Sequence, residues 1–221
     1  MRTVVFFGAP GSGKGTLASR TAKHHGLRVV SSGDALRNHV HRRTTVGVRV
    51  AEVLAAGRLV DDAIVADLMF SELHAASQDR ASLLLDGFPR SLHQAEWLAD
   101  TLPTVSRSLD AVVNLDVPER VILGRIENRW IHAPSGRTYN YSFNPPKTHG
   151  LDDITGERLT KRADDDIDTF KARIAKFNDT TTPILEYYHS KGILNSFKGE
   201  TSDQLFPQID HKLGHIFGFK Q

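Results

Sequence analysis

The sequence predicts an α/β fold in which helices cover both faces of a five-stranded parallel sheet. Short apolar runs, several of them rich in β-branched residues, recur along the chain and are typical of strands buried on both faces. Segments compatible with helices separate these runs, which indicates strand–helix alternation. The 221 residues are 39% hydrophobic and 24% charged, which is enough apolar material for a substantial core and excludes a disordered chain.

The expected elements follow one another along the whole chain. Strands are expected at residues 3–7, 27–30, 82–86, 111–116 and 192–197. Helices are expected at residues 15–25, 33–42, 46–56, 62–76, 94–101, 118–129 and 166–191. Because the first strand begins at Thr3, no signal segment or presequence is expected ahead of it.

Two stretches depart from this alternation. Residues 31–60 read as helix and turn, inserted between the second and third strands. Residues 131–161 are rich in Gly, Pro, Asn, Thr and Tyr, with alternating apolar residues and no helical period, so they predict short strands and turns. Insertions of this length are commonly functional lids.

Composition excludes several classes of protein. The chain has no cysteine, which excludes disulfides, a thiolate nucleophile and any zinc site built on cysteine. No apolar run approaches the roughly 20 residues that a membrane-spanning helix needs, so no membrane association is expected. The net charge of +2 forms no basic stripe in the sequence, so nucleic acid is not an expected partner.

The first predicted strand runs directly into a glycine-rich loop. Residues 8–16 read Gly-Ala-Pro-Gly-Ser-Gly-Lys-Gly-Thr, the strand–loop–helix arrangement of a P-loop. Glycines let backbone N–H groups point at phosphate oxygens, the following helix presents its positive end, and Lys14 reaches the β- and γ-phosphates. The loop predicts a P-loop nucleoside triphosphate hydrolase-like fold, with the triphosphate bound by Gly11, Ser12, Gly13, Lys14, Gly15 and Thr16.

The metal that accompanies the triphosphate is expected to have no direct protein ligand. Gly15 stands where the usual motif has a serine or threonine, and the hydroxyl comes one position later, at Thr16. We therefore expect Mg²⁺ to be held by phosphates and water, with Asp86 at the end of the third strand orienting those waters. The alternative interpretation of Asp86 is a helix or turn cap.

Several further motifs resemble the adenylate kinase family over nearly the whole chain. Within that family the chain is similar to the long-lid form, and to the mitochondrial GTP:AMP phosphotransferase group of eukaryotes. Besides the P-loop, the motifs that carry this resemblance are Ser31-Ser32-Gly33-Asp34-x-Leu36-Arg37, Asp86-Gly87-Phe88-Pro89-Arg90, Arg129-Trp130-Ile131-His132-x-x-Ser135-Gly136-Arg137-x-Tyr139, Phe143-Asn144-Pro145-Pro146-Lys147, Leu151-Asp152-Asp153-Ile154-Thr155-Gly156-Glu157 and Gly199-Glu200-Thr201-Ser202.

The resemblance implies an enzyme that reversibly transfers the γ-phosphoryl group of GTP or ATP to AMP with Mg²⁺ as cofactor, giving ADP. It also implies three parts: a core (1–30, 61–127 and 166–221), an AMP-binding arm (31–60) and a lid (128–165). A monomer in the mitochondrial matrix is expected, with the cytoplasm as the alternative location. Two other functions stay open, a pyrimidine nucleoside monophosphate kinase and a non-catalytic nucleotide sensor.

Arginines suit this chemistry because phosphoryl transfer needs positioning and charge neutralisation, and a guanidinium binds two phosphate oxygens at once. The resemblance implies that Arg37 and Arg90 hold the AMP phosphate and that Arg125 and Arg129 hold the triphosphate. Arg162 and Arg173 would bridge both nucleotides. The implied catalytic residues are Lys14, Arg90, Arg129, Arg162 and Arg173.

The spacing of these arginines agrees with such roles in part. Arg125 and Arg129 are four residues apart and would share one helix face. Arg162 and Arg173 are eleven apart, close to three helical turns, so one face could carry both if the helix extends that far. Alternatively, the acidic residues 164–166 cap that helix and leave Arg162 outside. A single arginine could equally lie on a solvated helix face.

Further positions that match the adenylate kinase family imply additional contacts with the nucleotides. Gln94 can read adenine, because its amide accepts and donates hydrogen bonds at once, although it could also be an exposed helical residue. Thr138 and Tyr139 would pack beside the base of the triphosphate, and Ser202, in the loop after the fifth strand, would contact that base through its backbone. The implied AMP site comprises Ser32, Arg37, Arg58, Leu59, Val60, Gly87, Phe88, Pro89, Arg90, Gln94, Arg162 and Arg173.

The lid is expected to hold no zinc. Some lids of this family bind zinc through four cysteines, and the matching positions here are His132, Ser135, Asp152 and Thr155. Without thiolates, this set predicts a hydrogen-bonded tetrad that holds the lid together. The remaining histidines, among them His24, His25, His39 and His41, are expected on polar helix faces and not as ligands.

Overall fold

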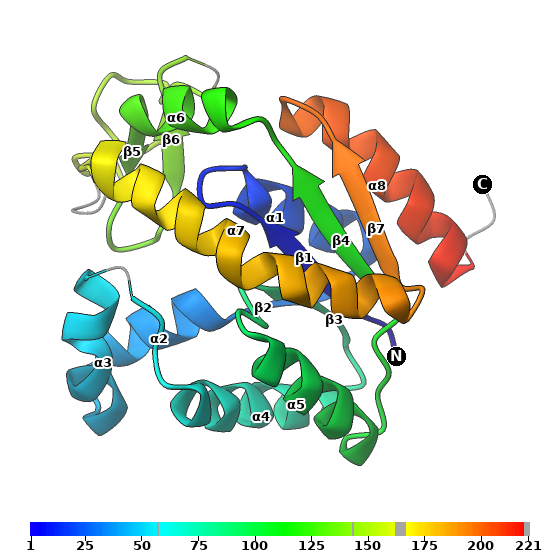
Figure 1. Cartoon of the computed structure of the whole chain (residues 1–221). Coiled ribbons are helices and arrows are strands. Elements are labelled where there is room, and N and C mark those ends of the chain that lie inside the picture. The colour runs from blue at the N-terminus through cyan, green and yellow to red at the C-terminus, as the bar shows by residue number, and fades with distance from the viewer. Residues whose placement is uncertain (57, 143, 162–166, 219–221) are drawn as a thin grey trace.

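The structure, a computed structural model, describes residues 1–56, 58–142, 144–161 and 167–218. At its centre lies a five-stranded parallel sheet in the order β2-β3-β1-β4-β7, with helices on both faces (Figure 1). The prediction of an α/β fold with a parallel sheet is confirmed. The strands of this sheet are β1 (Thr3–Gly8), β2 (Leu27–Ser31), β3 (Ser82–Asp86), β4 (Ala111–Asp116) and β7 (Leu194–Lys198).

Two expectations about the helices are wrong. No helix was expected after residue 191, yet Leu205, Ile209 and Leu213, spaced four apart, are buried on one face of α8. The helix expected at residues 118–129 ends at Glu127, so Arg129 begins strand β5 instead of sharing a helix face with Arg125. The helices are α1 (Lys14–His25), α2 (Ser32–His41), α3 (Thr45–Ala55), α4 (Asp62–Gln78), α5 (Leu92–Thr104), α6 (Glu119–Glu127), α7 (Ile167–Ser190) and α8 (Ser202–Phe217).

Alternating side chains of β1 divide the core into two layers. Val5 and Phe7 pack in the apolar cluster that includes residues of α4, α5 and α7, while Val4 and Phe6 pack in the cluster that includes residues of α1 and α8. All four are nearly inaccessible to water. Burial of such a side chain stabilises the folded state by about 1.5–3 kcal/mol, so these two layers fix β1 firmly in the middle of the sheet.

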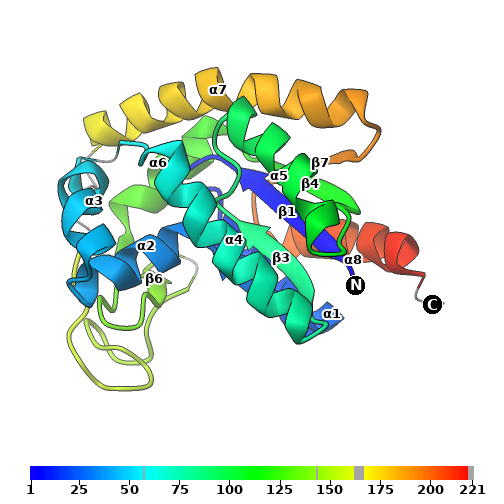
Figure 2. The same cartoon turned by 90° about the horizontal axis from the view of Figure 1, so that it is seen from below.

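The carboxyl ends of the strands meet at one edge of the sheet. Because β1 and β3 are parallel and pair Phe6 with Asp86, the loops that follow these two strands lie next to each other. The arm, 31–60, follows the neighbouring strand β2 and consists of α2 and α3, as predicted. The arm and the lid both extend from this side of the molecule (Figures 1 and 2).

The lid, 128–165, contains little regular structure in its described part. Strands β5 (Arg129–Ile131) and β6 (Thr138–Asn140) form an antiparallel pair, and isolated bridges join Ile131 to Thr160 and Leu151 to Arg158. The prediction of short strands and turns is confirmed. Among the described residues, no helix is long and apolar enough to cross a membrane.

The packing of α3 against α2 in the arm can be tested by substitution at Gly47. A Cβ added at Gly47 in α3 would lie 2.0 Å from the backbone oxygen of His39 in α2, whereas one added at Gly214 in α8 would meet nothing within 4 Å. Gly47→Ala should therefore destabilise the chain by roughly 1–3 kcal/mol, because two helix backbones must separate. Gly214→Ala should be neutral or stabilise by up to about 1 kcal/mol, because alanine favours helix. Urea unfolding measures both, and equal stability of the two variants would contradict the packing.

Candidate active site

The glycine loop after β1 folds back against the strand that carries it. Gly11 and Gly13 have φ values of 80° and 88°, a left-handed conformation that other residues rarely adopt. A Cβ added at Gly8 would lie 2.6 Å from Ser12 Oγ and 3.2 Å from Leu115 Cβ. The loop therefore needs glycine at these positions to place its backbone N–H groups ahead of α1, as the P-loop prediction requires.

Lys14 connects this loop to the next strand of the sheet. It is the first residue of α1, and its ammonium group forms an ion pair with the Asp86 carboxylate at the end of β3. Both side chains are mostly shielded from water. Asp86 offers the carboxylate oxygens that suit Mg²⁺, and Thr16 lies exposed on the first turn of α1, so this corner has the donor types that the metal prefers.

Arg125 donates to three backbone oxygens on two segments, the P-loop and the residues after β7. Its guanidinium donates to the backbone oxygens of Ser12 at 2.8 Å and Gly11 at 3.3 Å, and to that of Glu200 after β7. Burial lowers the pKa of Arg125 below its ordinary value. Ser202 lies beside the same loop, since its Oγ is 3.4 Å from the point where a Gly13 Cβ would stand. Ser202 is the first residue of α8, not part of a loop as expected.

A second set of side chains surrounds the turn that follows β3. Ser32 Oγ and Arg90 Nε both donate to the backbone oxygen of Gly87, each at 2.7 Å. Gly87 has a φ of 75°, and the peptide bond between Phe88 and Pro89 is cis. Phe88 is buried and packs edge-on against Trp97 of α5. These contacts hold Arg90 and Ser32 on one turn, and both were predicted AMP contacts.

Gln94 is fixed at the start of α5 by residues from two other segments. Its Oε1 accepts from the Arg90 backbone N–H at 2.7 Å, and its Nε2 donates to Asp62 Oδ1 at 2.6 Å. The other oxygen of Asp62 accepts from the Ser91 hydroxyl at 2.9 Å. The amide keeps one further N–H and one further lone pair. Gln94 is 4% exposed, so the alternative of an exposed helical residue is wrong.

Sequence reasoning missed Asp62. It begins α4 next to the helix-capping Asp61, so its position suggested only a helix terminus. Its contact with Gln94 joins residues 32 apart in the chain, which no local pattern reveals. The one signal for Asp62 in the sequence was its position, two residues after the predicted AMP-contacting segment at 58–60.

The remaining predicted AMP contacts come from the arm. Arg37 in α2 forms an ion pair with Asp34 one turn earlier, and its guanidinium lies over Gly33. The segment between α3 and α4 follows, where Arg58 and Leu59 are exposed and Val60 is buried in the core. These residues stay predictions as nucleotide contacts, because the described contacts are all within the protein.

The two halves of the predicted site meet at consecutive residues. The side chain of Asp86 pairs with Lys14 of the P-loop, while the backbone oxygen of Gly87 accepts from Ser32 and Arg90 on the predicted AMP side. Consecutive Cα atoms are about 3.8 Å apart. The sheet therefore places the predicted phosphate-binding loop beside the turn that leads to Arg90.

The predicted residues of the lid lie elsewhere. Arg129 and Tyr139 stand on the paired strands β5 and β6, and Thr138 is exposed at the start of β6. The Tyr139 hydroxyl donates to Asp152 Oδ1 at 2.8 Å, so this ring is part of the lid interior. Arg162 lies outside the described residues. Arg173 falls within α7, which starts at Ile167 and is described there by its backbone.

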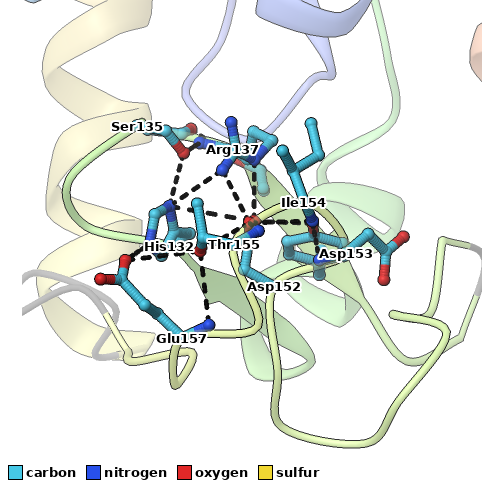
Figure 3. Close-up of polar contacts among 11 residues, drawn as sticks. His132, Ser135, Arg137, Asp152, Asp153, Ile154, Thr155 and Glu157 are labelled. Carbon is cyan, nitrogen blue, oxygen red and sulfur yellow. Dashed lines mark hydrogen bonds and ion pairs between the residues drawn. The ribbon is translucent and has the colours of Figure 1, made fainter.

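The lid is held together by a polar network around Asp152 (Figure 3). The four tetrad residues are hydrogen-bonded as predicted: His132 Nδ1 lies 2.7 Å from Ser135 Oγ, and the Thr155 hydroxyl donates to Asp152 Oδ2 at 3.0 Å. Arg137 adds two donations to Asp152, at 2.8 and 2.6 Å. Among the described residues, no group of three or more potential ligands could hold a metal ion.

Arg137 and Glu157 are members of this network that sequence reasoning missed. Arg137 was quoted only as part of a motif, and Glu157, whose carboxylate contacts His132 Nε2, only as the end of another. Both lie within two residues of a tetrad member. Their position within two residues of a tetrad member was the signal in the sequence that could have identified them.

One histidine is not on a polar surface as expected. The His25 side chain is 4% exposed and lies between α1 and α8, 2.8 Å from Asp210 and edge-on against Phe217. Burial lowers its pKa, partly opposed by Asp210. His24 remains exposed, in agreement with the prediction.

The lid network makes stability depend on pH in a defined direction. Hydrogen bonds from Arg137 hold the pKa of Asp152 well below its ordinary value near 3.9. The stabilisation is therefore fully present above about pH 4 and is lost as pH falls below it, because the unfolded chain then binds more protons. Thermal unfolding of the parent chain and of Asp152→Asn should differ most at neutral pH and converge below about pH 4. A difference in melting temperature between the two proteins that stays constant from pH 7 to 3 would contradict this role of Asp152.

Comparison with known proteins agrees with this geometry. The family model described as adenylate kinase matches residues 6–193. A mitochondrial GTP:AMP phosphotransferase of Saccharomyces cerevisiae is 45% identical over 218 residues, covering 97% of this chain and 93% of its own length. One of Drosophila melanogaster is 41% identical, covering 93% and 92%, and adenylate kinase 4 of Arabidopsis thaliana is 38% identical, covering 92% and 82%. The chain belongs to the adenylate kinase family.

Proposed function

We propose that this enzyme transfers the terminal phosphoryl group of GTP to AMP, reversibly and with Mg²⁺, in mitochondria. Membership of the adenylate kinase family supports the reaction class. The choice of GTP and the location are supported by the names of the yeast and fly relatives, which are mitochondrial GTP:AMP phosphotransferases. The nucleotides are then the partners of a chain that acts as a monomer.

One observation carries the proposal. Lys14 of the P-loop pairs with Asp86, and the next residue, Gly87, holds Arg90 and Ser32. A triphosphate on the loop and a monophosphate at Arg90 would face each other across this junction. A protein that only bound a nucleotide would not need a second cationic site at that distance.

The residues act by positioning and by neutralising charge. Lys14 and the loop N–H groups would bind the β- and γ-phosphates, and Arg90 with Arg37 would bind the AMP phosphate. The bond from the γ-phosphorus to the β-phosphate oxygen breaks as a bond to an AMP phosphate oxygen forms, and the nucleoside diphosphate leaves. The attacking oxygen is already ionised at neutral pH, so no base is needed. Bound Mg²⁺, oriented through water by Asp86, would neutralise charge on the β- and γ-phosphates.

Water must be kept from the γ-phosphoryl group, and the lid supplies the means. Arg129 on β5 and the predicted pair Arg162 and Arg173 would approach the transferred group from the lid side. Gln94 would bind adenine through its remaining N–H and lone pair, since Asp62 and Arg90 already fix the amide. This arrangement favours AMP over a pyrimidine monophosphate.

Removal of either central cation should stop catalysis without unfolding the chain. Lys14→Met and Arg90→Met should each lower kcat/KM by at least tenfold, because a hydrogen bond to a charged group contributes roughly 1.5–3 kcal/mol. The matched control is Lys23→Met, an exposed lysine in the last turn of the same helix as Lys14. A coupled assay of ADP formation measures the rates. Equal activity of all three variants would refute the assignment of the catalytic cations.

The substrates are identified by initial rates with varied donors and acceptors. With AMP as acceptor, we expect GTP to give a higher kcat/KM than ATP, and with GTP as donor, AMP to exceed UMP and CMP. Preference for UMP or CMP would establish the pyrimidine kinase instead. Tight nucleotide binding without turnover in any combination would establish the sensor.

A further inference from the structure

Two histidines on the outer face of α8 bring their ring nitrogens close together. His211 and His215 are both exposed and lie one helical turn apart. Their Nε2 atoms are 3.2 Å apart, with ring planes inclined at 83°. No other two of the eleven histidines in the sequence are four residues apart. This pair plays no part in the proposed phosphoryl transfer.

The separation of the two nitrogens matches what a shared metal ion requires. Zinc binds histidine nitrogen at about 2.0–2.1 Å. An ion at that distance from both Nε2 atoms, 3.2 Å apart, would see them at an angle of about 100°, close to the tetrahedral value of about 109°. This separation is compatible with both Nε2 atoms binding one ion in place of their contact with each other.

The position on the helix also favours a cation. α8 ends at Phe217, so the pair occupies its last two turns, where the backbone oxygens give the helix its negative end. The carboxylate nearest in sequence, Asp210, is bound to His25 at 2.8 Å. In the part of the chain that the structure describes, no third ligand completes a cluster, so water would fill the other positions.

We propose that His211 and His215 form a binding site for a divalent transition-metal ion such as Zn²⁺ or Cu²⁺. Imidazole nitrogen suits these ions, whereas the Mg²⁺ of the catalytic reaction prefers oxygen and would not compete. The sequence analysis expects these histidines on the surface and not among ligands, and the structure confirms that both are exposed. The site is independent of the proposed kinase activity.

The test is a calorimetric titration of the full chain with Zn²⁺ at pH 7.5, with Mg²⁺ as the negative probe. We expect one Zn²⁺ per chain, and affinity reduced by at least about tenfold in His211→Gln and in His215→Gln. His24→Gln is the matched control, an exposed histidine on the neighbouring helix that lies 3.4 Å from Asp210. His24→Gln should bind zinc with the same affinity as the parent chain.

Fold and activity are checked in the same variants. His211→Gln and His215→Gln should keep the melting temperature and the AMP kinase rate measured without zinc, while saturating zinc should raise the melting temperature of the parent chain and of His24→Gln only. Unchanged zinc affinity in either His211→Gln or His215→Gln overturns the proposal, because the ion then binds elsewhere, for example at His132 in the lid. An equal loss of zinc affinity in His24→Gln also overturns the proposal.

Discussion

The parallel pairing of β1 with β3 is the constraint on which the site depends. It sets Phe6 beside Asp86, so that the loop after one strand and the turn after the other end at the same edge. A slip of one residue would turn Asp86 to the opposite face of the sheet and leave Lys14 without its carboxylate. The register is held by the two apolar layers, in which Val4 and Phe6 face one way and Val5 and Phe7 the other.

Some arginines of this protein hold backbone oxygens in place, whereas others are proposed to bind phosphate. Arg107 was not predicted to matter, yet it is 5% exposed and donates to the backbone oxygens of Ala76 and Ala81 and to the Ser77 hydroxyl. Arg125 likewise donates hydrogen bonds to backbone oxygens of the P-loop. Such arginines are bound by fixed backbone oxygens, and their burial lowers the pKa of both. Arg90, in contrast, is an exposed residue whose Nε donates to the backbone oxygen of Gly87.

The strands and the P-loop could be predicted from sequence because their signals are local. The strand at 82–86 was predicted with its observed bounds, and Gly11 and Gly13 adopt the backbone conformations that glycine permits. Contacts between distant residues could not be predicted in this way. Asp62 reaches Gln94 across 32 residues, and His25 is buried only because α8 packs over it. The family resemblance supplied roles for single residues, but not the protein groups that orient them.

The helix α8 shows how a missed element changes the interpretation of others. Its period of four was visible in Leu205, Ile209 and Leu213, yet Pro207 and Gly214 weakened the helical pattern. Once α8 is in place, Ser202 becomes a helix residue beside the P-loop, and the two histidines near the other end of that helix become neighbours in space.

An amide in the predicted lid contacts the backbone of the arginine that holds the P-loop. Asn140, in β6 of the lid, donates through Nδ2 to the backbone oxygen of Arg125 at 2.8 Å, and the side chain of that same arginine grips the P-loop. If the lid swings about the end of α6, it must either break this bond or pull the arginine's backbone with it. A movement of the lid is therefore expected to reach the P-loop through Arg125.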